Sequence, residues 1–297
     1  MIQCHCRQAQ PKCTTVPLFV RVLDPQLCGK ADYTRHNPPP CTHWGQLKLL
    51  LSEIEFLTPF FGQPLQVVYA GAAPGVHIPV LASMFASMRF VLVDPQPSMI
   101  KNREYSNIVV VRDFMSDALA AEFVGSSTLF ISDVRVGAAG ERESDEEQQE
   151  RIQRDMDAQR RWIEIMCPAA SMLKFRLPWR PGVTNYLSGR IFFPVYGKAL
   201  THEARLVVPS GAGVVDYDNR LYEQQMAYFN RRLRPAVQSV LGNGCYDCTS
   251  FRWIVRGYLI KTLGSGFDPS SVDAHCIAIE LELKGYVIAW TSCRNNI

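Results

Sequence analysis

The chain has 297 residues, of which 47% are hydrophobic and 20% are charged, and its formal net charge at pH 7 is +3. A chain of this length and composition can bury a sizeable core, which excludes general disorder and a fibrous structure. The small net charge excludes attraction of nucleic acid by an overall basic field, so such binding has to come from local clusters of Lys and Arg.

The sequence shows no pattern typical of a transmembrane segment or of a secretory signal peptide. The apolar runs, such as 65–73, are too short to span a bilayer, and residues 1–12 lack the apolar segment of a secretory signal peptide. Ten cysteines are scattered over the chain, several of them in apolar segments, which is typical of free thiols in a reducing compartment. We therefore expect a cytosolic protein without a transmembrane segment.

The N-terminal part changes character near residue 43. Residues 1–42 show little periodicity and end in three consecutive prolines, so we expect an irregular arm. The following apolar residues recur at helical spacing and predict an amphipathic helix: Leu47, Leu50, Leu51, Ile54 and Leu57.

Strand and helix patterns then alternate along the chain. A β-branched run at 65–70 is followed by the glycine-containing loop 71–75 and by helical spacing from Val80. Further strands are predicted at 89–93, 108–111, 128–132, 171–176 and 204–208, and helices before residue 161 and over 221–233. This alternation predicts an α/β fold with a mostly parallel central sheet and right-handed crossovers.

The C-terminal segment has a different pattern. Polar and apolar residues alternate from Cys276, and a second apolar run begins at Tyr286, which predicts a β-hairpin. The patterns divide the chain into an irregular arm at 1–42, one α/β domain at 43–260 and an extension at 261–297.

The loop after the first strand and the acid after the second indicate a nucleoside cofactor. Gly71 and Gly75 allow the backbone of the loop to approach a ligand, and exposed amides there can meet a carboxylate or hydroxyl. Asp94 closes the next strand, where a doubly wound sheet places an acid that accepts hydrogen bonds from ribose hydroxyls. The three-glycine dinucleotide motif is missing, which favours S-adenosylmethionine over NAD.

Six segments of the sequence carry a family resemblance. They are 45–51 (GQLKLLL), 67–77 (VVYAGAAPGVH), 129–135 (LFISDVR), 173–176 (LKFR), 203–206 (EARL) and 222–223 (YE). In this order they resemble the poxvirus cap-specific mRNA 2′-O-methyltransferases, which double as the small, processivity subunit of the viral poly(A) polymerase. The resemblance covers roughly residues 33–260.

The resemblance implies a Rossmann-like, class I S-adenosylmethionine-dependent methyltransferase with the family's catalytic tetrad at Lys48, Asp133, Lys174 and Glu203. Lys174 would remove the proton from the ribose 2′-hydroxyl of the first transcribed nucleotide. A lysine acts as a base near neutral pH only if its pKa falls from about 10.4 toward about 7 to 8. A second ammonium from Lys48 and partial burial would lower it, while Asp133 would orient Lys174 and Glu203 would hold Lys48.

The resemblance also assigns a cofactor site. Its residues are Gln46, Tyr69, Gly71, Gly75, His77, Asp94 and Asp133, with Arg112, Asp113 and Phe114 near the adenine edge. One departure is the pair Pro95 and Gln96, which stands where the family has an Arg two positions after the ribose-binding acid. His77 has the alternative role of a helix cap.

Cap recognition is expected from two aromatic rings that sandwich the cationic 7-methylguanine. Trp179 and Tyr33 are the candidates for these rings, and Glu223 is the candidate acceptor for the guanine N1 and N2 protons. Two positions depart from the family: a second guanine-reading acid falls on Pro181, and a pocket-lining aromatic falls on Leu200. Candidate contacts to RNA phosphates are Arg176, Arg180, Arg190, Lys198 and Arg205.

We expect no metal site, because Cys245 and Cys248 form a single C-x-x-C pair and Cys4 and Cys6 add only scattered donors. The expected partners are 7-methylguanosine-capped mRNA and the catalytic subunit of a poly(A) polymerase, in the virion and the host cytoplasm. Two alternatives stay open: methylation of internal ribose positions, and a non-catalytic RNA-binding polyadenylation subunit.

Overall fold

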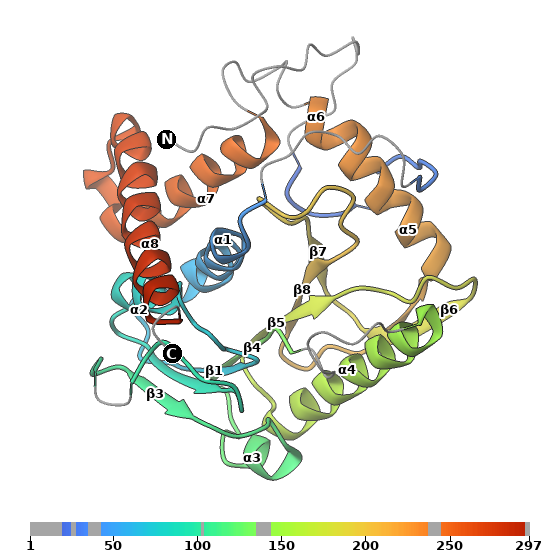
Figure 1. The fold of residues 1–297 in the computed structure, drawn as a ribbon, viewed down its shortest axis with the longest axis horizontal. Helices are drawn as coiled ribbons and strands as arrows, with labels where there is room; N and C mark the ends of the chain where they lie inside the picture. Colours follow the sequence, from blue (N-terminus) through green and yellow to red (C-terminus); the bar gives the residue numbers. More distant parts are fainter. Residues whose placement is uncertain are drawn as a thin grey trace.

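A computed structural model describes residues 20–24, 28–34, 43–101, 104–134, 144–236 and 245–294 (Figure 1). Cys4 and Cys6 lie outside the described residues. Among the residues that the structure describes, no helix is both long and apolar enough to cross a membrane.

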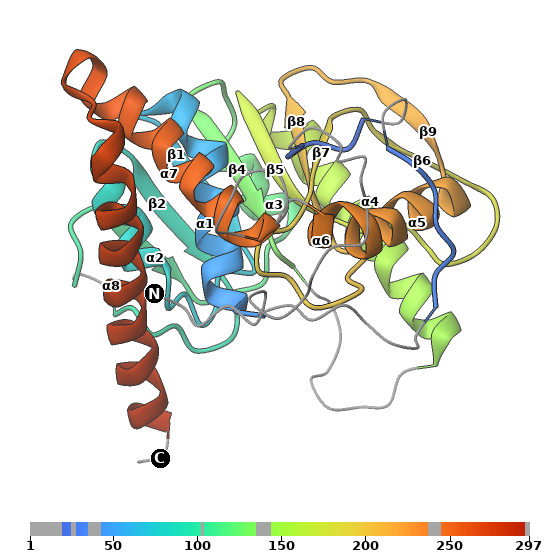
Figure 2. The ribbon, with the colours of Figure 1, turned by 90° about the horizontal axis from the view of Figure 1, so that it is seen from above.

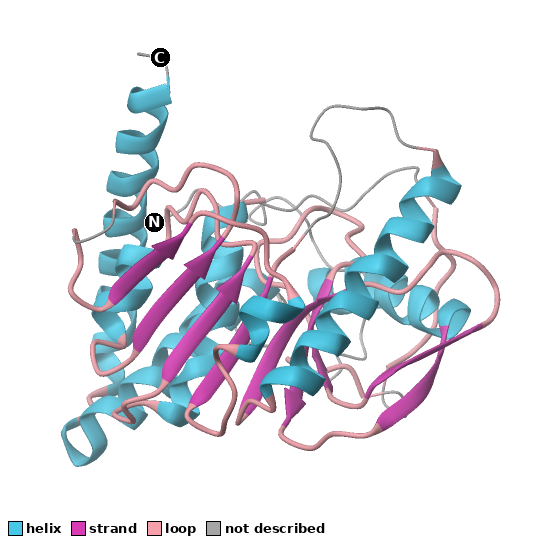
Figure 3. Cartoon of the chain, turned by 90° about the horizontal axis from the view of Figure 1, so that it is seen from below, coloured by secondary structure: helices cyan, strands magenta, loops and turns pink. Residues whose placement is uncertain are grey.

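A seven-stranded sheet forms the centre of the fold, in the order β3-β2-β1-β4-β5-β8-β7 (Figure 3). The strands are β1 (Gln66–Ala70), β2 (Arg89–Val93), β3 (Ile108–Val111), β4 (Thr128–Ser132), β5 (Ala170–Phe175), β7 (Arg190–Phe192) and β8 (Ala204–Pro209). The strands from β3 to β5 are parallel, whereas β8 runs antiparallel to both of its neighbours. The predicted mostly parallel sheet is confirmed.

Both faces of this sheet are covered by helices, as the apolar runs of the inner strands require. In β1, Val67 and Tyr69 face one core while Val68 and Ala70 face the other. The first core contains α1 (Gly45–Leu57), α2 (Ile78–Met84), α7 (Tyr246–Leu263) and α8 (Val272–Arg294) (Figure 2). The second contains α3 (Asp117–Ala121), α4 (Asp145–Met166) and α5 (Asn219–Tyr228).

Several smaller elements complete the described chain. A separate two-stranded antiparallel sheet, which the sequence analysis did not predict, pairs β6 (Val183–Leu187) with β9 (Val214–Asp218). The predicted helix at 221–233 is α5 followed by a π-helical turn, Phe229–Leu233, and by α6 (Arg234–Ala236). Short 3-10 turns lie at Thr58–Phe60, Gly264–Gly266 and Pro269–Ser271.

The predicted C-terminal β-hairpin is wrong, because the segment forms the helix α8. Its buried residues Val272, Cys276, Ile279 and Leu283 are four, three and four positions apart, which places them on one face of a helix. Ala, Glu, Leu and Lys are strong helix formers, and this preference outweighs the local alternation. These residues belong to the same core as α1, and the domain boundary at 260 stays a prediction.

A capping box fixes the start of α4. The Ser144 hydroxyl accepts a hydrogen bond from the Glu147 amide, and the Glu147 carboxylate accepts one from the Ser144 amide. In the turn that follows, Gln149 Oε1 accepts a hydrogen bond from the Trp179 amide at 2.6 Å. The first turns of α4 therefore also position the segment that carries Trp179.

We predict that Ser144→Ala destabilises the protein by about 1 kcal/mol, because it removes the hydroxyl oxygen that accepts a hydrogen bond from the Glu147 amide. For a protein of this size, thermal unfolding should show a Tm about 2 to 4 °C lower. Ser87→Ala is the control, since Ser87 is exposed and its hydroxyl only contacts a loop carbonyl at 3.4 Å. Equal Tm values for the two variants would contradict the role of the cap.

Candidate functional site

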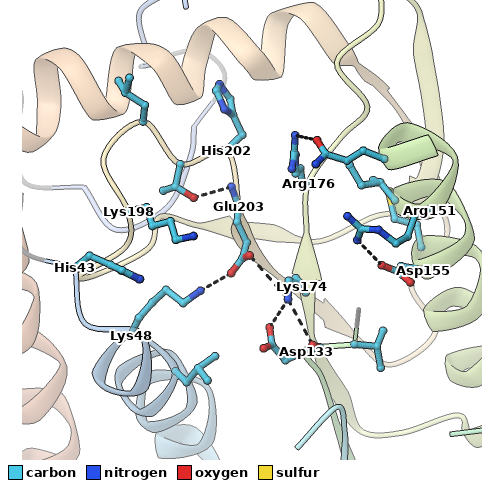
Figure 4. Close-up of a pocket in the computed structure, with 18 of the residues that line it drawn as sticks. His43, Lys48, Asp133, Arg151, Asp155, Lys174, Arg176, Lys198, His202 and Glu203 are labelled. Carbon is cyan, nitrogen blue, oxygen red and sulfur yellow. Dashed lines mark hydrogen bonds and ion pairs between the residues drawn. The ribbon is translucent and has the colours of Figure 1, made fainter. Parts of the chain in front are cut away.

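The carboxyl ends of the parallel strands meet at one edge of the sheet, where ligands bind in open α/β folds. A cavity of about 710 Å³ opens there, between α1, α4 and the segment that precedes β8. The whole predicted tetrad lines it: Lys48, Asp133, Lys174 and Glu203 (Figure 4). The structure thus brings together four residues that are up to 155 positions apart in the sequence.

The four side chains form a connected set of ion pairs. Lys48 Nζ donates to Glu203 Oε1 at 2.5 Å, and Lys174 Nζ lies 3.1 Å from Asp133 Oδ1. Lys174 Nζ is also 3.9 Å from Glu203 Oε2, so Glu203 contacts both lysines. Their side chains are between 13% and 19% exposed, so the group is largely shielded but reachable from the cavity.

Arg205, a candidate contact to RNA phosphate in the sequence, is instead a fifth member of this cluster. Its side chain is buried, Nη1 donates to Asp133 Oδ1 at 2.8 Å, and Nη2 lies 3.6 Å from Glu203 Oε1. Arg205 is also the register partner of Lys174 in the β5–β8 pair. Side chains directly opposite in such a pair share one face of the sheet, so two cations stand side by side.

The electrostatics of the two carboxyl groups follow from these contacts. Burial by itself raises the pKa of Asp133, but the charges of Lys174 and Arg205 outweigh it and lower that pKa to about 2. Burial acts in the same way on Glu203, and Lys48, Lys174 and Arg205 together hold its pKa well below its ordinary value. Both carboxylates are therefore ionised at neutral pH and balance the cations around them.

The loop after β1 touches this cluster through the backbone. Gly71 has φ +79°, and a Cβ atom built there would lie 2.8 Å from the carbonyl carbon of Asp133 and from the Val134 nitrogen. Only glycine fits such a contact at a positive φ. The Asp133 amide also donates to the Ala70 carbonyl at 2.9 Å. The predicted cofactor loop and Asp133 are therefore packed as one unit.

A buried polar network connects the same loop to α1. The Glu53 carboxylate is fully buried and accepts hydrogen bonds from the Tyr69 hydroxyl at 2.7 Å and from His77 Nε2 at 3.0 Å. His77 Nδ1 lies 2.9 Å from Gln46 Oε1 at the first turn of α1. Tyr69 and His77 thus contact Glu53, which sequence reasoning missed, and their contact with a cofactor stays a prediction.

The remaining predicted cofactor residues lie at the ends of β2 and β3. Asp94 accepts hydrogen bonds from the amides of Ala73 and Gln96, at 3.0 and 2.8 Å, so it ties the first loop to the second. Arg112, Asp113 and Phe114 follow β3, and Phe114 is 71% exposed. Because β3, β2 and β1 are adjacent, these loops share the sheet edge that holds Asp133.

Three rings meet at the far side of the cavity. The centroids of Tyr33 and Trp179 are 5.2 Å apart, and their planes are inclined by 51°. The His202 ring, which sequence reasoning missed, lies 4.7 Å from Tyr33 and 5.2 Å from Trp179. Tyr33 and Trp179 thus lie together, and their role as the two rings around 7-methylguanine stays a prediction, whereas Glu223 on α5 is not among the residues that line the described cavity.

The predicted phosphate contacts are divided between several places. Arg176 and Lys198 line the cavity, and the Arg176 guanidinium lies 4.9 Å from the centroid of the Trp179 ring. Arg180 is exposed, while Arg190 lines a separate, mainly apolar cavity of about 570 Å³ beside Phe192. Arg190 therefore does not belong to the tetrad cavity.

The two cysteines of the C-x-x-C pair lie close together. Cys245 and Cys248, at the start of α7, have sulfur atoms 3.6 Å apart, and Cys248 Sγ lies 3.6 Å from the Tyr196 hydroxyl. Within the described residues, His, Cys, Asp and Glu side chains form no group of three that could hold a metal ion.

Comparisons with known proteins were made with the whole chain. The family described as poly A polymerase regulatory subunit matches residues 23–280. A cap-specific mRNA (nucleoside-2′-O-)-methyltransferase of myxoma virus (strain Lausanne) is 25% identical over 269 residues, covering 84% of this chain and 78% of the relative. The protein of the same name from fowlpox virus (strain NVSL) is 25% identical over 265 residues, covering 80% of this chain and 84% of the relative.

One solved structure was also compared. The VP4 protein of bluetongue virus, described as a multifunctional RNA-capping production line, superposes with a TM-score of 0.46 at 16% sequence identity. The match covers 74% of this chain and 40% of that one.

We predict that Gly71→Ala destabilises the protein by at least about 1 to 2 kcal/mol more than Gly62→Ala does. Both glycines have a positive φ, +79° and +82°, so both substitutions strain the backbone by about 1 kcal/mol or more. Only at Gly71 does the added carbon meet the Asp133 backbone, since nothing lies within 4 Å at Gly62. Urea unfolding of the two variants measures the difference, and equal losses would contradict the close packing.

The low pKa of Asp133 predicts how stability depends on pH. Its pKa falls on folding from the ordinary 3.8 to about 2, so the stability from this ionisation is present above about pH 4 and is lost as the pH drops toward 2. Between these values the wild type should lose about 2 kcal/mol more than Asp133→Asn does. Urea unfolding at several pH values measures the free energy of unfolding of both proteins. Glu122→Gln is the control, because Glu122 is exposed. Parallel pH profiles for wild type and Asp133→Asn would contradict the low pKa of Asp133.

Proposed function

The chain belongs to the poly A polymerase regulatory subunit family, and we propose that it is a cap-specific mRNA 2′-O-methyltransferase. It transfers a methyl group from S-adenosylmethionine to the ribose 2′-hydroxyl of the first transcribed nucleotide of an RNA that carries a 7-methylguanosine cap. Relatives from myxoma virus and fowlpox virus bear the name of this activity.

The observation that carries the proposal is the position of Lys174. Its Nζ atom lies in the cavity, between the carboxylates of Asp133 and Glu203 at 3.1 and 3.9 Å, and the three rings line the same cavity. A ribose hydroxyl can therefore reach a lysine whose position is held by carboxylates. At the same time, the guanine of the adjoining cap can reach the three rings. This is the geometry that a general base requires.

Lys174 suits the role of base better than the other two cations. Arg205 stays protonated in proteins, and the Lys48 ammonium is held by Glu203 at 2.5 Å. The cluster contains three cations and two carboxylates, so loss of one proton from Lys174 leaves two charges of each sign. Lys174 Nζ then takes the proton of the 2′-hydroxyl, and Asp133 holds the resulting ammonium in place.

The residues of the sheet edge fit S-adenosylmethionine. Gly71 lets the loop after β1 pack directly against the Asp133 backbone, and the Asp94 carboxylate lies at the end of β2 with oxygens able to accept further hydrogen bonds. The exposed Phe114 offers a face for stacking of the adenine, beside Arg112 and Asp113. When bound, the cofactor supplies an electrophilic methyl group that the ribose oxygen accepts as its proton leaves.

A role in polyadenylation is the second candidate. The description of the family favours it, since it names a regulatory subunit of poly A polymerase. We propose that the chain pairs with a poly(A) polymerase catalytic subunit and that both activities coexist, in the virion and the host cytoplasm of a poxvirus-like agent. The complete lysine and carboxylate cluster favours retention of catalysis over a purely RNA-binding role.

We expect labelled methyl groups from S-adenosylmethionine to enter short capped RNA, at the first transcribed ribose, and not the same RNA without a cap. Lys174→Ala should lower kcat by at least about 100-fold, and Lys174→Arg should not restore it, because removal of a general base costs about 10²- to 10⁴-fold and arginine stays protonated. Equilibrium binding of S-adenosylmethionine should change little in either variant.

Lys261→Ala is the matched control, because Lys261 is exposed on α7. Equal labelling of uncapped RNA would move the activity to internal ribose positions. If the wild type transfers no label but still binds RNA, the role in polyadenylation would remain as the candidate function.

A further inference from the structure

The His202 ring has an unusual environment for a histidine at the edge of a cavity. The residue is only 5% exposed, and its ring lies edge-on to both Tyr33 and Trp179, at interplanar angles of 62° and 81°. It comes directly before Glu203, so the ring cluster and the catalytic cluster are neighbours along one short segment (Figure 4).

The backbone of this segment is tightly held. The Tyr222 hydroxyl donates to the His202 carbonyl at 2.7 Å, and the side-chain Nδ2 of Asn230 donates to the Thr201 carbonyl at 2.8 Å. The backbone of His202 is therefore held in place, which is a requirement for a residue that positions a ligand.

The Nε2 atom of His202 is buried and has no hydrogen-bond partner among the described residues. Leaving a buried polar atom unsatisfied costs about 1 to 3 kcal/mol, and such atoms in native proteins commonly mark a functional site. Nearby, Nε of Arg176 is also buried and has no hydrogen-bond partner in the described chain. Two buried polar atoms beside the aromatic rings can therefore form hydrogen bonds with a ligand.

We propose that His202 is a specificity-determining residue of the base pocket: its ring forms one wall, and its Nε2 atom hydrogen-bonds to the edge of the purine base of the cap. The inference rests on the proposed function. It also requires Tyr33 to rotate, because a base between two rings needs about 7 Å, twice a contact distance of about 3.5 Å, whereas the Tyr33 and Trp179 centroids are 5.2 Å apart.

The charge of His202 suits this role. Burial, and after it the nearby Arg176 guanidinium, lowers the pKa of the imidazole to about 4, so the ring is neutral at pH 7. A neutral imidazole has one nitrogen that accepts a hydrogen bond and one that donates. His202 can therefore accept a hydrogen bond from an N–H group of the guanine edge, as Glu223 was expected to do, without adding a positive charge next to the cationic 7-methylguanine.

The test uses fluorescence titration of the full-length protein with 7-methyl-GDP and with GDP. His202→Phe keeps a ring without the nitrogen, His202→Gln keeps a polar atom without the ring, and His202→Ala removes both. We expect Kd for 7-methyl-GDP to rise about 10-fold in the Ala variant and about 5-fold in the Phe variant, with the Gln variant within about 3-fold of wild type. His275→Ala on α8 is the matched control, because His275 is exposed and its Nδ1 atom lies 2.8 Å from the carbonyl of Ser271 on the preceding turn.

Wild-type affinity in the Ala and Phe variants would overturn the inference, and so would full rescue by Phe with no rescue by Gln. Steady-state methylation of capped RNA provides an independent readout: KM should rise in the Ala variant while kcat at saturating RNA stays within about 2-fold. If the wild type methylates capped RNA but no His202 variant changes KM, the inference fails and the proposed function stands. If the wild type transfers no methyl group, the proposed function itself fails.

Discussion

Two cations stand directly opposite each other in the β5–β8 pair, and the arrangement of the site follows from the need to neutralise them. Lys174 and Arg205 are register partners on one face of the sheet, where like charges repel. Asp133, at the carboxyl end of β4, and Glu203, directly before β8, each contact both cations. Lys48 reaches the same cluster from α1, so a helix and three strands depend on one set of charges.

The antiparallel direction of β8 is what makes this cluster possible. In a parallel arrangement the residue before the strand would lie at the opposite edge of the sheet from the end of β4. Because β8 is reversed, its start lies beside the end of β5, and Glu203 meets Lys174 and Asp133. The loop after β1 contacts Asp133 at Gly71, and the network around Glu53 joins the same loop to α1.

The fold was predictable wherever burial on both faces of the sheet demanded continuous apolar runs, as in β1, β2 and β4. It was mispredicted at α8, where a residue pattern with period two also contains a helical stripe. Local alternation cannot distinguish these cases, because the choice depends on the core formed by α1, α2 and α7. The pairing of β6 with β9 was missed because β9 is almost entirely exposed and the buried positions of β6 include the polar Thr184, so neither strand shows an apolar alternation in its sequence.

The sequence by itself determined the strand and helix alternation, the glycine loop and the identity of the four tetrad residues, the last only through resemblance. The alternation and the loop follow from residue types at short spacings, whereas spacing alone gave no reason to group the four tetrad residues. The tertiary structure decided that Arg205 is buried among the carboxylates, that Glu53 holds Tyr69 and His77, and that His202 joins Tyr33 and Trp179. Such contacts depend on strand register and direction between segments far apart in the chain, and the polarity of a single residue carries no information about either.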